Sequence, residues 1–337
     1  MRIAVDLMGG DHGAGELMPA ILRCEQEFPD LSLALVGDEQ HIAGLLPGKG
    51  GVAGRVTIVH AGETVEMTDS PSVALRQKRD SSMHVAIEQV RDHGADACVS
   101  AGNTGALMAV ARHILKTVPG IDRPAIIKAI PSVKGRCYLL DLGANINCSA
   151  GNLVQFAAMG SLMCSAVEGV ESPRVGLLNI GEEDVKGGGS VREAAQRLKQ
   201  HPKINFIGFV EGDGIYQSDA EVLVCDGWVG NVALKTSEGL AKFVSYMIEQ
   251  AFTRNVATKA AAVVSNPVLN MLREQLSPEN YNGATLLGLN GIVVKSHGRA
   301  RADGFYHAIR VAMREVEQDI PSLLQARIGE MLEVRQS

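Results

Sequence analysis

The sequence predicts an α/β fold built around a mainly parallel sheet. Strand-like and helix-like segments alternate along the chain of 337 residues, which is the pattern of consecutive β–α units. Several strand-like runs are continuously apolar, as expected for strands that are buried on both faces. With 46% apolar residues the chain can also bury a large core.

Ten segments are predicted to be strands, because they are short, rich in apolar and β-branched residues and bounded by turn residues. In chain order they are RIAVDLM (2–8), LSLALVGD (31–38), RVTIVHAG (55–62), ACVSAG (97–102), PAIIKAI (124–130), CYLLDLG (137–143), RVGLLNIG (174–181), INFIGFV (204–210), EVLVCDG (221–227) and GIVVKSHG (291–298).

Amphipathic helices are predicted between most of these strands, for example over residues 15–28, 151–169 and 231–252. Residues 239–277 are different, because they look almost wholly helical and contain a break at Asn266-Pro267. We expect a helical hairpin that projects from the sheet. The whole chain, 1–337, is predicted to be a single α/β domain with this hairpin as an insertion.

Charge and cysteine usage narrow the class of protein. A net charge of −6 argues against a nucleic-acid-binding protein, which would carry a basic field. The six cysteines form no CxxC pair, and most lie in apolar runs, where buried free thiols are expected. The chain starts with a strand-like run rather than a signal peptide, and we expect no apolar run long enough to span a bilayer. These observations predict a soluble, cytoplasmic protein.

Small and polar residues follow six predicted strands at their carboxyl ends, where ligands bind in open parallel sheets. We expect all six turns on the side of the sheet where function resides. Their glycines would let backbone amides approach a ligand, and helix N-termini favour anions. The residues are Asp6, Gly9, Gly10, Asp11 and His12; Ser100, Gly102, Asn103, Thr104 and Gly105; Asp141, Gly143 and Asn145; the turn Asn179–Ser190; Asp226 and Asn231; and Lys295, His297 and Gly298.

Two of these turns are the best candidates for anion binding. SAGNTGALM is a candidate anion cradle, although Asn103 or Thr104 could also serve simply as a helix N-cap, and the two roles are compatible. In NIGEEDVKGGGS, a lysine among glycines could bind a phosphate or a developing oxyanion, with acidic neighbours holding its ammonium. The alternative for this second turn is a solvated loop with surface charges.

Several common catalytic motifs are missing from the sequence. We find no GxGxxG fingerprint, no GxxxxGK[ST] loop, no GxSxG elbow and no HExxH. His84 and His113 are expected to be ordinary helix residues, and only His12 and His297 lie at candidate site turns. No serine or cysteine has an evident nucleophile context, and we expect no metal and no cofactor.

Taken together and in order, the turns resemble those of the bacterial phosphate acyltransferases of phospholipid synthesis, the PlsX family, also called acyl-ACP:phosphate acyltransferases. The resemblance runs from Arg2 to about residue 310. Its matching strings are IAVDLMGGDHG, SPSVALRQKRDSSMHVA, SAGNTGALMA, RPA, LDLGAN, LLNIGEEDVKG, DGWVGNVALK, GATLLGLNG and KSHGRA.

The resemblance implies the fold and the reaction. It implies a Rossmann-like α/β/α sandwich similar to phosphotransacetylases and isocitrate-type dehydrogenases. It also implies transfer of a long-chain fatty acyl group from the thioester of acyl carrier protein to inorganic phosphate. The acyl phosphate would then be used by a downstream glycerol-3-phosphate acyltransferase. The family forms homodimers, and in some members the hairpin touches the membrane, so a peripheral contact at the inner face of the membrane is expected.

The resemblance also suggests site residues. Lys186 and Asn231 match the residues carried over as catalytic. The phosphate and substrate would be bound by Asp6, Gly9, Gly10, Asp11, Ser100, Gly102, Asn103, Thr104, Asn145, Lys295 and His297. Acyl carrier protein is acidic, so a basic rim is expected despite the negative net charge. Arg254, Lys259 and Arg273 on the hairpin are the candidates for contact with the carrier protein or with the membrane. Each of them could also be an ordinary solvated charge.

Three other functions compete with this reading. One is a phosphotransacetylase-like enzyme that uses short-chain acyl-CoA. Another is a nicotinamide-dependent dehydrogenase on a related sheet, which the missing fingerprint does not exclude. The last is a membrane-associated scaffold for carrier protein without catalytic activity.

Overall fold

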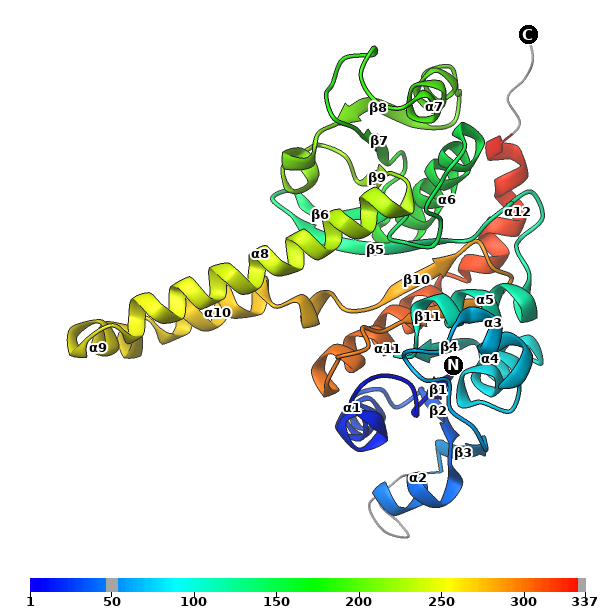
Figure 1. The fold of residues 1–337 in the computed structure, drawn as a ribbon, viewed down its shortest axis with the longest axis vertical. Coiled ribbons are helices and arrows are strands. Elements are labelled where there is room, and N and C mark those ends of the chain that lie inside the picture. Colours follow the sequence, from blue (N-terminus) through cyan, green and yellow to red (C-terminus); the bar gives the residue numbers. More distant parts are fainter. Residues whose placement is uncertain (47–53, 333–337) are drawn as a thin grey trace.

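The computed structural model describes residues 1–46 and 54–332 (Figure 1). The strands of this part of the chain are β1 Arg2–Asp6, β2 Ser32–Gly37, β3 Val56–His60, β4 Ala97–Ser100, β5 Ala125–Ser132, β6 Gly135–Leu140, β7 Arg174–Leu178, β8 Asn205–Val210, β9 Val222–Val224, β10 Ala284–Leu287 and β11 Ile292–Lys295.

The helices are α1 Gly13–Glu27, α2 Glu39–Leu45, α3 Pro71–Gln77, α4 Ser82–Arg91, α5 Thr104–Leu115, α6 Ala150–Glu168, α7 Gly189–Lys199, α8 Gly227–Thr253, α9 Val256–Val264, α10 Asn266–Leu276, α11 Ala302–Glu317 and α12 Ile320–Leu332, with two 3₁₀ turns, η2 Gly212–Tyr216 and η3 Pro278–Tyr281.

All ten predicted strands are present, and they join one 11-stranded sheet in the order β3-β2-β1-β4-β11-β10-β5-β6-β9-β7-β8. Most neighbours are parallel, which confirms the predicted fold class. The additional strand, β10, is antiparallel to both of its neighbours, β11 and β5, and β5 is antiparallel to β6. As a result β6, β7 and β9 run opposite to β1, β4 and β11.

This reversal corrects one sequence-based expectation. The six polar turns do not lie on one side of the sheet. Three follow the carboxyl ends of β1, β4 and β11, and three follow those of β6, β7 and β9, which point in the opposite direction. The strand β10 is antiparallel to both β11 and β5 and so leaves these two parallel to each other. The reversal of the second half comes from the hairpin between β5 and β6, which are antiparallel neighbours.

Helices cover both faces of the sheet. In β1, Ile3 and Val5 belong to a core cluster shared with α1 and α11, whereas Ala4 belongs to a cluster shared with α4 and α5. This alternation is the period of a strand with two buried faces. In the second half of the sheet, α6, α7 and α12 pack in a third cluster.

One helix contradicts the expectation about apolar runs. Of the described helices, α6 is the one that is long and apolar enough to cross a membrane, by length and composition only. Its apolar window is 72% buried within the protein, and it contributes Phe156, Met159 and Leu162 to the core. Its apolar composition is therefore that of a core helix that packs on several sides.

The helical hairpin projects from the sheet as predicted, and Figure 1 shows α8, α9 and α10 extending away from the rest of the chain. It is rooted earlier than expected, because α8 already begins at Gly227. Asn255 caps α9 through its side chain, and Pro267 lies in the first turn of α10, where a missing N–H costs nothing. Large apolar side chains along the hairpin are exposed, namely Leu240, Phe243, Tyr246, Met247, Val256, Val263, Val264, Val268 and Met271.

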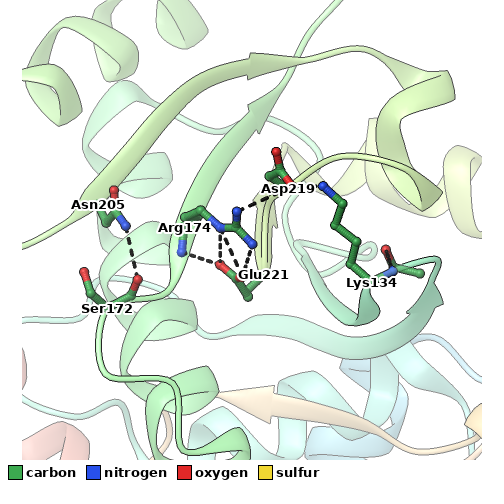
Figure 2. Close-up of polar contacts among 7 residues, drawn as sticks. Lys134, Ser172, Arg174, Asn205, Asp219 and Glu221 are labelled. Carbon is green, nitrogen blue, oxygen red and sulfur yellow. Dashed lines mark hydrogen bonds and ion pairs between the residues drawn. The ribbon is translucent and has the colours of Figure 1, made fainter.

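A polar network joins the amino ends of β7 and β9 to the turn between β5 and β6 (Figure 2). The guanidinium of Arg174 donates to Glu221 at 2.5 Å and lies 3.5 Å from Asp219, which also pairs with Lys134. None of these residues lines the cleft described below. The network therefore fixes the positions of β7 and β9 relative to the β5–β6 turn, at the ends of these strands that lie away from the cleft.

Candidate functional site

A cleft of about 940 Å³ lies between α8, the strand β5 and the turns that follow β6 and β11. Its lining includes residues from five of the predicted turns or their helices: Asp11, Thr104, Gly143, Asn231, Lys295 and His297. The cleft reaches both sets of turns because α8 runs past both of them. Asn231 of α8 lies beside Gly143, which follows β6, and Lys235 of α8 lies beside His297, which follows β11. It has the size of an ordinary small-molecule site.

The first side of the cleft is built on a buried carboxylate. Ser100 donates a hydrogen bond of 2.6 Å to Asp6, and the backbone N of Gly9 donates to the same carboxylate at 3.2 Å. Burial raises the pKa of Asp6, and these hydrogen bonds oppose the rise. Asp6, Ser100 and Gly9 are buried and support the turns, rather than lining the cleft.

The glycines of these turns allow a close backbone approach. A Cβ on Gly9 would stand 2.7 Å from the Asp6 carboxylate and 2.8 Å from the backbone N of Gly102. Gly10 has a φ of +98°, and the next residue, Asp11, donates its backbone N–H to the carbonyl of Gly298 at 2.8 Å. The turns after β1 and β11 are thereby joined.

Asn103 performs the structural role that the sequence left open. Its side chain accepts from the backbone N of Ala106 and donates to the carbonyls of Met67 and Asp69. It caps α5 and holds the preceding loop, while Thr104, in the first turn, is exposed and lines the cleft.

Lys295 is a buried amine at the end of β11. It donates to the carbonyl of Ala101 at 3.0 Å and also to that of Ser296. Burial lowers the pKa of Lys295 to about 7, although the nearby charge of Asp6 opposes this shift. Lys295 can therefore exist in either protonation state near neutral pH.

On the opposite side, the turn after β6 brings Gly143 beside Asn231. A Cβ on Gly143, whose φ is +122°, would stand 3.5 Å from the Cβ of Asn231. Asn145 is buried and donates to Asp141 and to the carbonyl of Pro124. It holds the turn in shape and does not line the cleft.

The helix α8 supplies the wall of the cleft. Asp226 caps it by accepting from the backbone N of Val229 at 2.9 Å. Asn231 is exposed in its second turn, and Lys235 follows one turn later. Lys235 pairs with Glu238 at 2.9 Å, and its Nζ lies 3.2 Å from Nε2 of His297.

The structure places Lys186 outside the residues that line this cleft. Lys186 is exposed on the turn after β7 and pairs with Glu183 at 3.0 Å. Asp184 pairs with Lys199 at 2.6 Å, and Asn179 donates to the carbonyls of Gly181 and Lys186. The opposite charges of this turn therefore pair with each other and with α7, and Asn179 closes the loop.

The remaining predicted residues lie at the rim or on the hairpin. His12 is exposed and precedes α1 without a side-chain cap. Arg254, Lys259 and Arg273 are exposed on α8–α10, away from the cleft lining. Among the described residues, no group of three or more His, Cys, Asp or Glu is placed to hold a metal ion.

Sequence reasoning missed four basic residues of the cleft, Lys128, Lys235, Lys242 and Arg299. Lys128 is a half-buried lysine on β5, and a charge inside the apolar run PAIIKAI was a signal that could have revealed it. Lys235 follows Asn231 by four residues, a spacing that puts both on one face of a helix. With Lys295 and His297 they make the cleft suited to an anionic ligand.

The comparisons agree on one family. A family model described as a fatty acid synthesis protein matches residues 1–323. Proteins named phosphate acyltransferase are similar over nearly the full length. The one from Nitrosococcus oceani is 50% identical over 329 residues, covering 97% of this chain and 96% of that relative. The one from Halorhodospira halophila is 51% identical over 333 residues, covering 98% and 97%.

Solved structures show the same fold at low identity. A phosphotransacetylase from Streptococcus pyogenes superposes with a TM-score of 0.63 and 19% identity, covering 94% of both chains. A 4-hydroxythreonine-4-phosphate dehydrogenase from Klebsiella pneumoniae gives 0.52 and 13%, covering 94% of this chain and 98% of that chain. Since enzymes of different chemistry share this sheet, the fold alone does not decide the reaction.

Proposed function

The chain belongs to the fatty acid synthesis protein family as a phosphate acyltransferase, and from this premise we propose that it transfers a long-chain fatty acyl group from the thioester of acyl carrier protein to inorganic phosphate. The products are acyl phosphate and free carrier protein. The observation that carries the proposal is the cleft, where Asn231 and three basic residues, Lys128, Lys235 and His297, face one space.

The reaction requires little covalent chemistry from the protein. A phosphate oxygen attacks the thioester carbonyl carbon, a C–O bond forms, and the C–S bond breaks as the carrier thiolate leaves and takes a proton. Orientation of two bound reactants supplies several kcal/mol of the barrier. A donor aimed at the developing oxyanion contributes about 3 kcal/mol. No protein nucleophile is needed in this scheme.

We assign the catalytic roles to Lys186 and Asn231. Asn231 lines the cleft, and its side-chain amide can donate to the oxyanion. The turn carrying Lys186 and the start of α8 follow the neighbouring parallel strands β7 and β9, which end at the same edge of the sheet. This adjacency supports a lysine that leaves Glu183 and reaches an anionic reactant when the substrates bind.

The partners and location follow from the same proposal. The exposed cations Arg254, Lys259 and Arg273 on the hairpin are proposed contacts for the acidic carrier protein or for anionic lipid. The apolar side chains exposed on α8–α10 suit either a second copy of the chain in a homodimer or the inner surface of the membrane. A downstream glycerol-3-phosphate acyltransferase would consume the acyl phosphate in the cytoplasm.

The test is direct product trapping. Purified protein is incubated with palmitoyl-acyl carrier protein and phosphate, and acyl phosphate is trapped with hydroxylamine. Phosphate-dependent product that is lost in Lys186→Ala and in Asn231→Ala would support both the reaction and the residues. Wild-type turnover by Lys186→Ala would remove that residue from the mechanism and leave the reaction standing.

A second candidate is transfer from short-chain acyl-CoA. The phosphotransacetylase-like fold favours it. The same assay with acetyl-CoA and butyryl-CoA separates the two, because a carrier-specific enzyme should form product only with the acyl carrier protein thioester. Product from acetyl-CoA alone would replace the first proposal with the second.

A further inference from the structure

Three basic side chains from three different elements converge in the cleft. Lys128 comes from β5, Lys235 from α8 and His297 from the turn after β11. Lys235 lies 3.2 Å from His297. Burial lowers the pKa of Lys128, and this lysine lines the cleft together with Lys235 and Glu238 of α8.

The contact between Lys235 and His297 brings two hydrogen-bond donors together. The backbone N–H of Arg299 donates to Nδ1 of His297 at 3.1 Å, so Nδ1 is an acceptor and the proton of the neutral ring is on Nε2. That Nε2–H faces the amine of Lys235. When the lysine is charged, both groups are donors, and an acceptor that both can reach satisfies them together.

The charge of the cleft favours an anion as that acceptor. Its lining contains Lys128, Lys235, Lys242, Lys295 and Arg299 against Asp11, Glu238 and Glu279. The chain as a whole has a net charge of −6. A positive cleft in a negative protein concentrates small anions at that point.

Among the described residues, neither Lys128 nor Lys242 of this group has a hydrogen bond or ion pair, and Lys128 is the one of the two that is half-buried rather than exposed. Lys235 is held by Glu238, and Lys295 by two backbone carbonyls. Within residues 1–46 and 54–332, only charge–charge effects and burial act on the amine of Lys128, with no hydrogen bond. A half-buried ammonium of this kind gains most from an anionic partner.

We propose that Lys128, Lys235 and His297 form the subsite for inorganic phosphate, with Lys128 contacting the phosphate directly. This inference rests on the proposed transfer to phosphate and names the residues that bind the nucleophile. Lys235 and Nε2–H of His297 each donate to a phosphate oxygen, and Lys128 donates to a third. The remaining oxygen attacks the thioester carbon while Asn231, on the same helix as Lys235, faces the carbonyl oxygen.

The test uses the variant Lys128→Met, which keeps the length of the side chain and removes the charge. The Michaelis constant for phosphate is expected to rise about 10- to 100-fold, as for loss of one hydrogen bond to a charged group. The Michaelis constant for the thioester should change by less than about twofold, a separation that a general structural defect would not give. Lys128→Arg should recover part of the phosphate affinity. Lys203→Met, at an exposed lysine that does not line the cleft, is the matched control.

Direct calorimetric titration with inorganic phosphate separates the subsite from the reaction. Phosphate binding by the wild type and its loss in Lys128→Met would support the subsite even if no thioester gives product, in which case the proposed reaction fails alone. An unchanged phosphate affinity in a folded Lys128→Met protein would overturn the subsite and leave the transfer reaction untouched.

Discussion

Asn145 donates two hydrogen bonds to a single oxygen of Asp141, one of 2.7 Å from its backbone N and one of 2.9 Å from its side chain. The other oxygen of Asp141 accepts from the backbone N of Ile126 and of Ala144. This buried carboxylate therefore organises the turn that brings Gly143 beside Asn231, and the shape of the cleft depends on it.

Removing this carboxylate should destabilise the fold. Asp141→Ala leaves four donors without their acceptor in a buried site, and each unsatisfied group costs about 1–3 kcal/mol, part of which relaxation recovers. We expect a loss of about 3 kcal/mol or more in the free energy of unfolding, measured with urea. Asp184→Ala, at an exposed carboxylate, should cost less than about 1 kcal/mol. Equal effects of the two variants would contradict this role of Asp141.

The start of α8 should tolerate no side chain at Gly227. A Cβ there would stand 2.7 Å from the carbonyl O of Asn145 and 2.9 Å from the carboxylate of Asp141. Gly227→Ala should therefore displace the helix start, cost about 1–3 kcal/mol and lower turnover through Asn231. Gly239→Ala lies in the same helix with nothing within 4 Å, and it should stabilise by about 0.5–1 kcal/mol. Thermal unfolding of both variants is the measurement.

The tip of the hairpin provides a test of membrane contact. Val263 and Val264 are 77% and 83% exposed on α9. If they enter an anionic bilayer, the double variant Val263→Ser, Val264→Ser should lower binding to anionic liposomes about tenfold or more, because each buried methyl or methylene group contributes about 0.8 kcal/mol. Flotation measures the bound fraction. Val133→Ser, at a valine that is 76% exposed on the β5–β6 turn, should leave flotation unchanged. Absence of wild-type flotation would remove the membrane proposal.

Local pattern was enough to predict most elements of the fold. The ten strands and the projecting hairpin follow from apolar runs, turn residues and the helical period, which act within a few residues. The strand β10 was missed because Ala284–Leu287 is four residues long and is bounded by Gly283 and Gly288, so it resembles a loop. The reversal of the sheet comes instead from the β5–β6 hairpin, whose connection, Val133-Lys134, is too short for the crossover that parallel neighbours need. The order of the strands in the sheet is set by pairing between distant segments, which a local pattern does not reveal.

The candidate site was predictable only in part for the same reason. Asn231, Lys295 and His297 were found because they occupy turns at strand ends. Lys128 and Lys235 were missed because a lysine on a strand or on a helix becomes part of a site only when another element faces it. The predicted catalytic pairing of Lys186 with Asn231 stays a prediction, since Lys186 is bound to Glu183 and does not line the cleft.

The stability of the protein should depend on one buried acid on α11. Glu315 is 1% exposed, and its only hydrogen bond among the described residues is from the hydroxyl of Thr285. Burial raises the pKa of Glu315 from its ordinary value of 4.5 to about 8. Between these values the folded protein keeps a proton on Glu315 that the unfolded chain has lost. Stability contributed by this group is therefore present at low pH and is lost as the pH rises toward 8.

Glu315→Gln should remove this dependence, because glutamine is neutral at every pH and can still accept from Thr285. We expect the variant to gain stability over the wild type as the pH rises from 5 to 8.5, by an amount on the order of a few kcal/mol. Urea unfolding across that range is the measurement, with Glu317→Gln, an exposed acid on the same helix, as the control. Glu315 lies in a second cavity, of about 180 Å³, that His307 also lines, and this imidazole is present in both proteins. A constant difference between Glu315→Gln and wild type at all pH values would show that Glu315 is ionised in the folded protein.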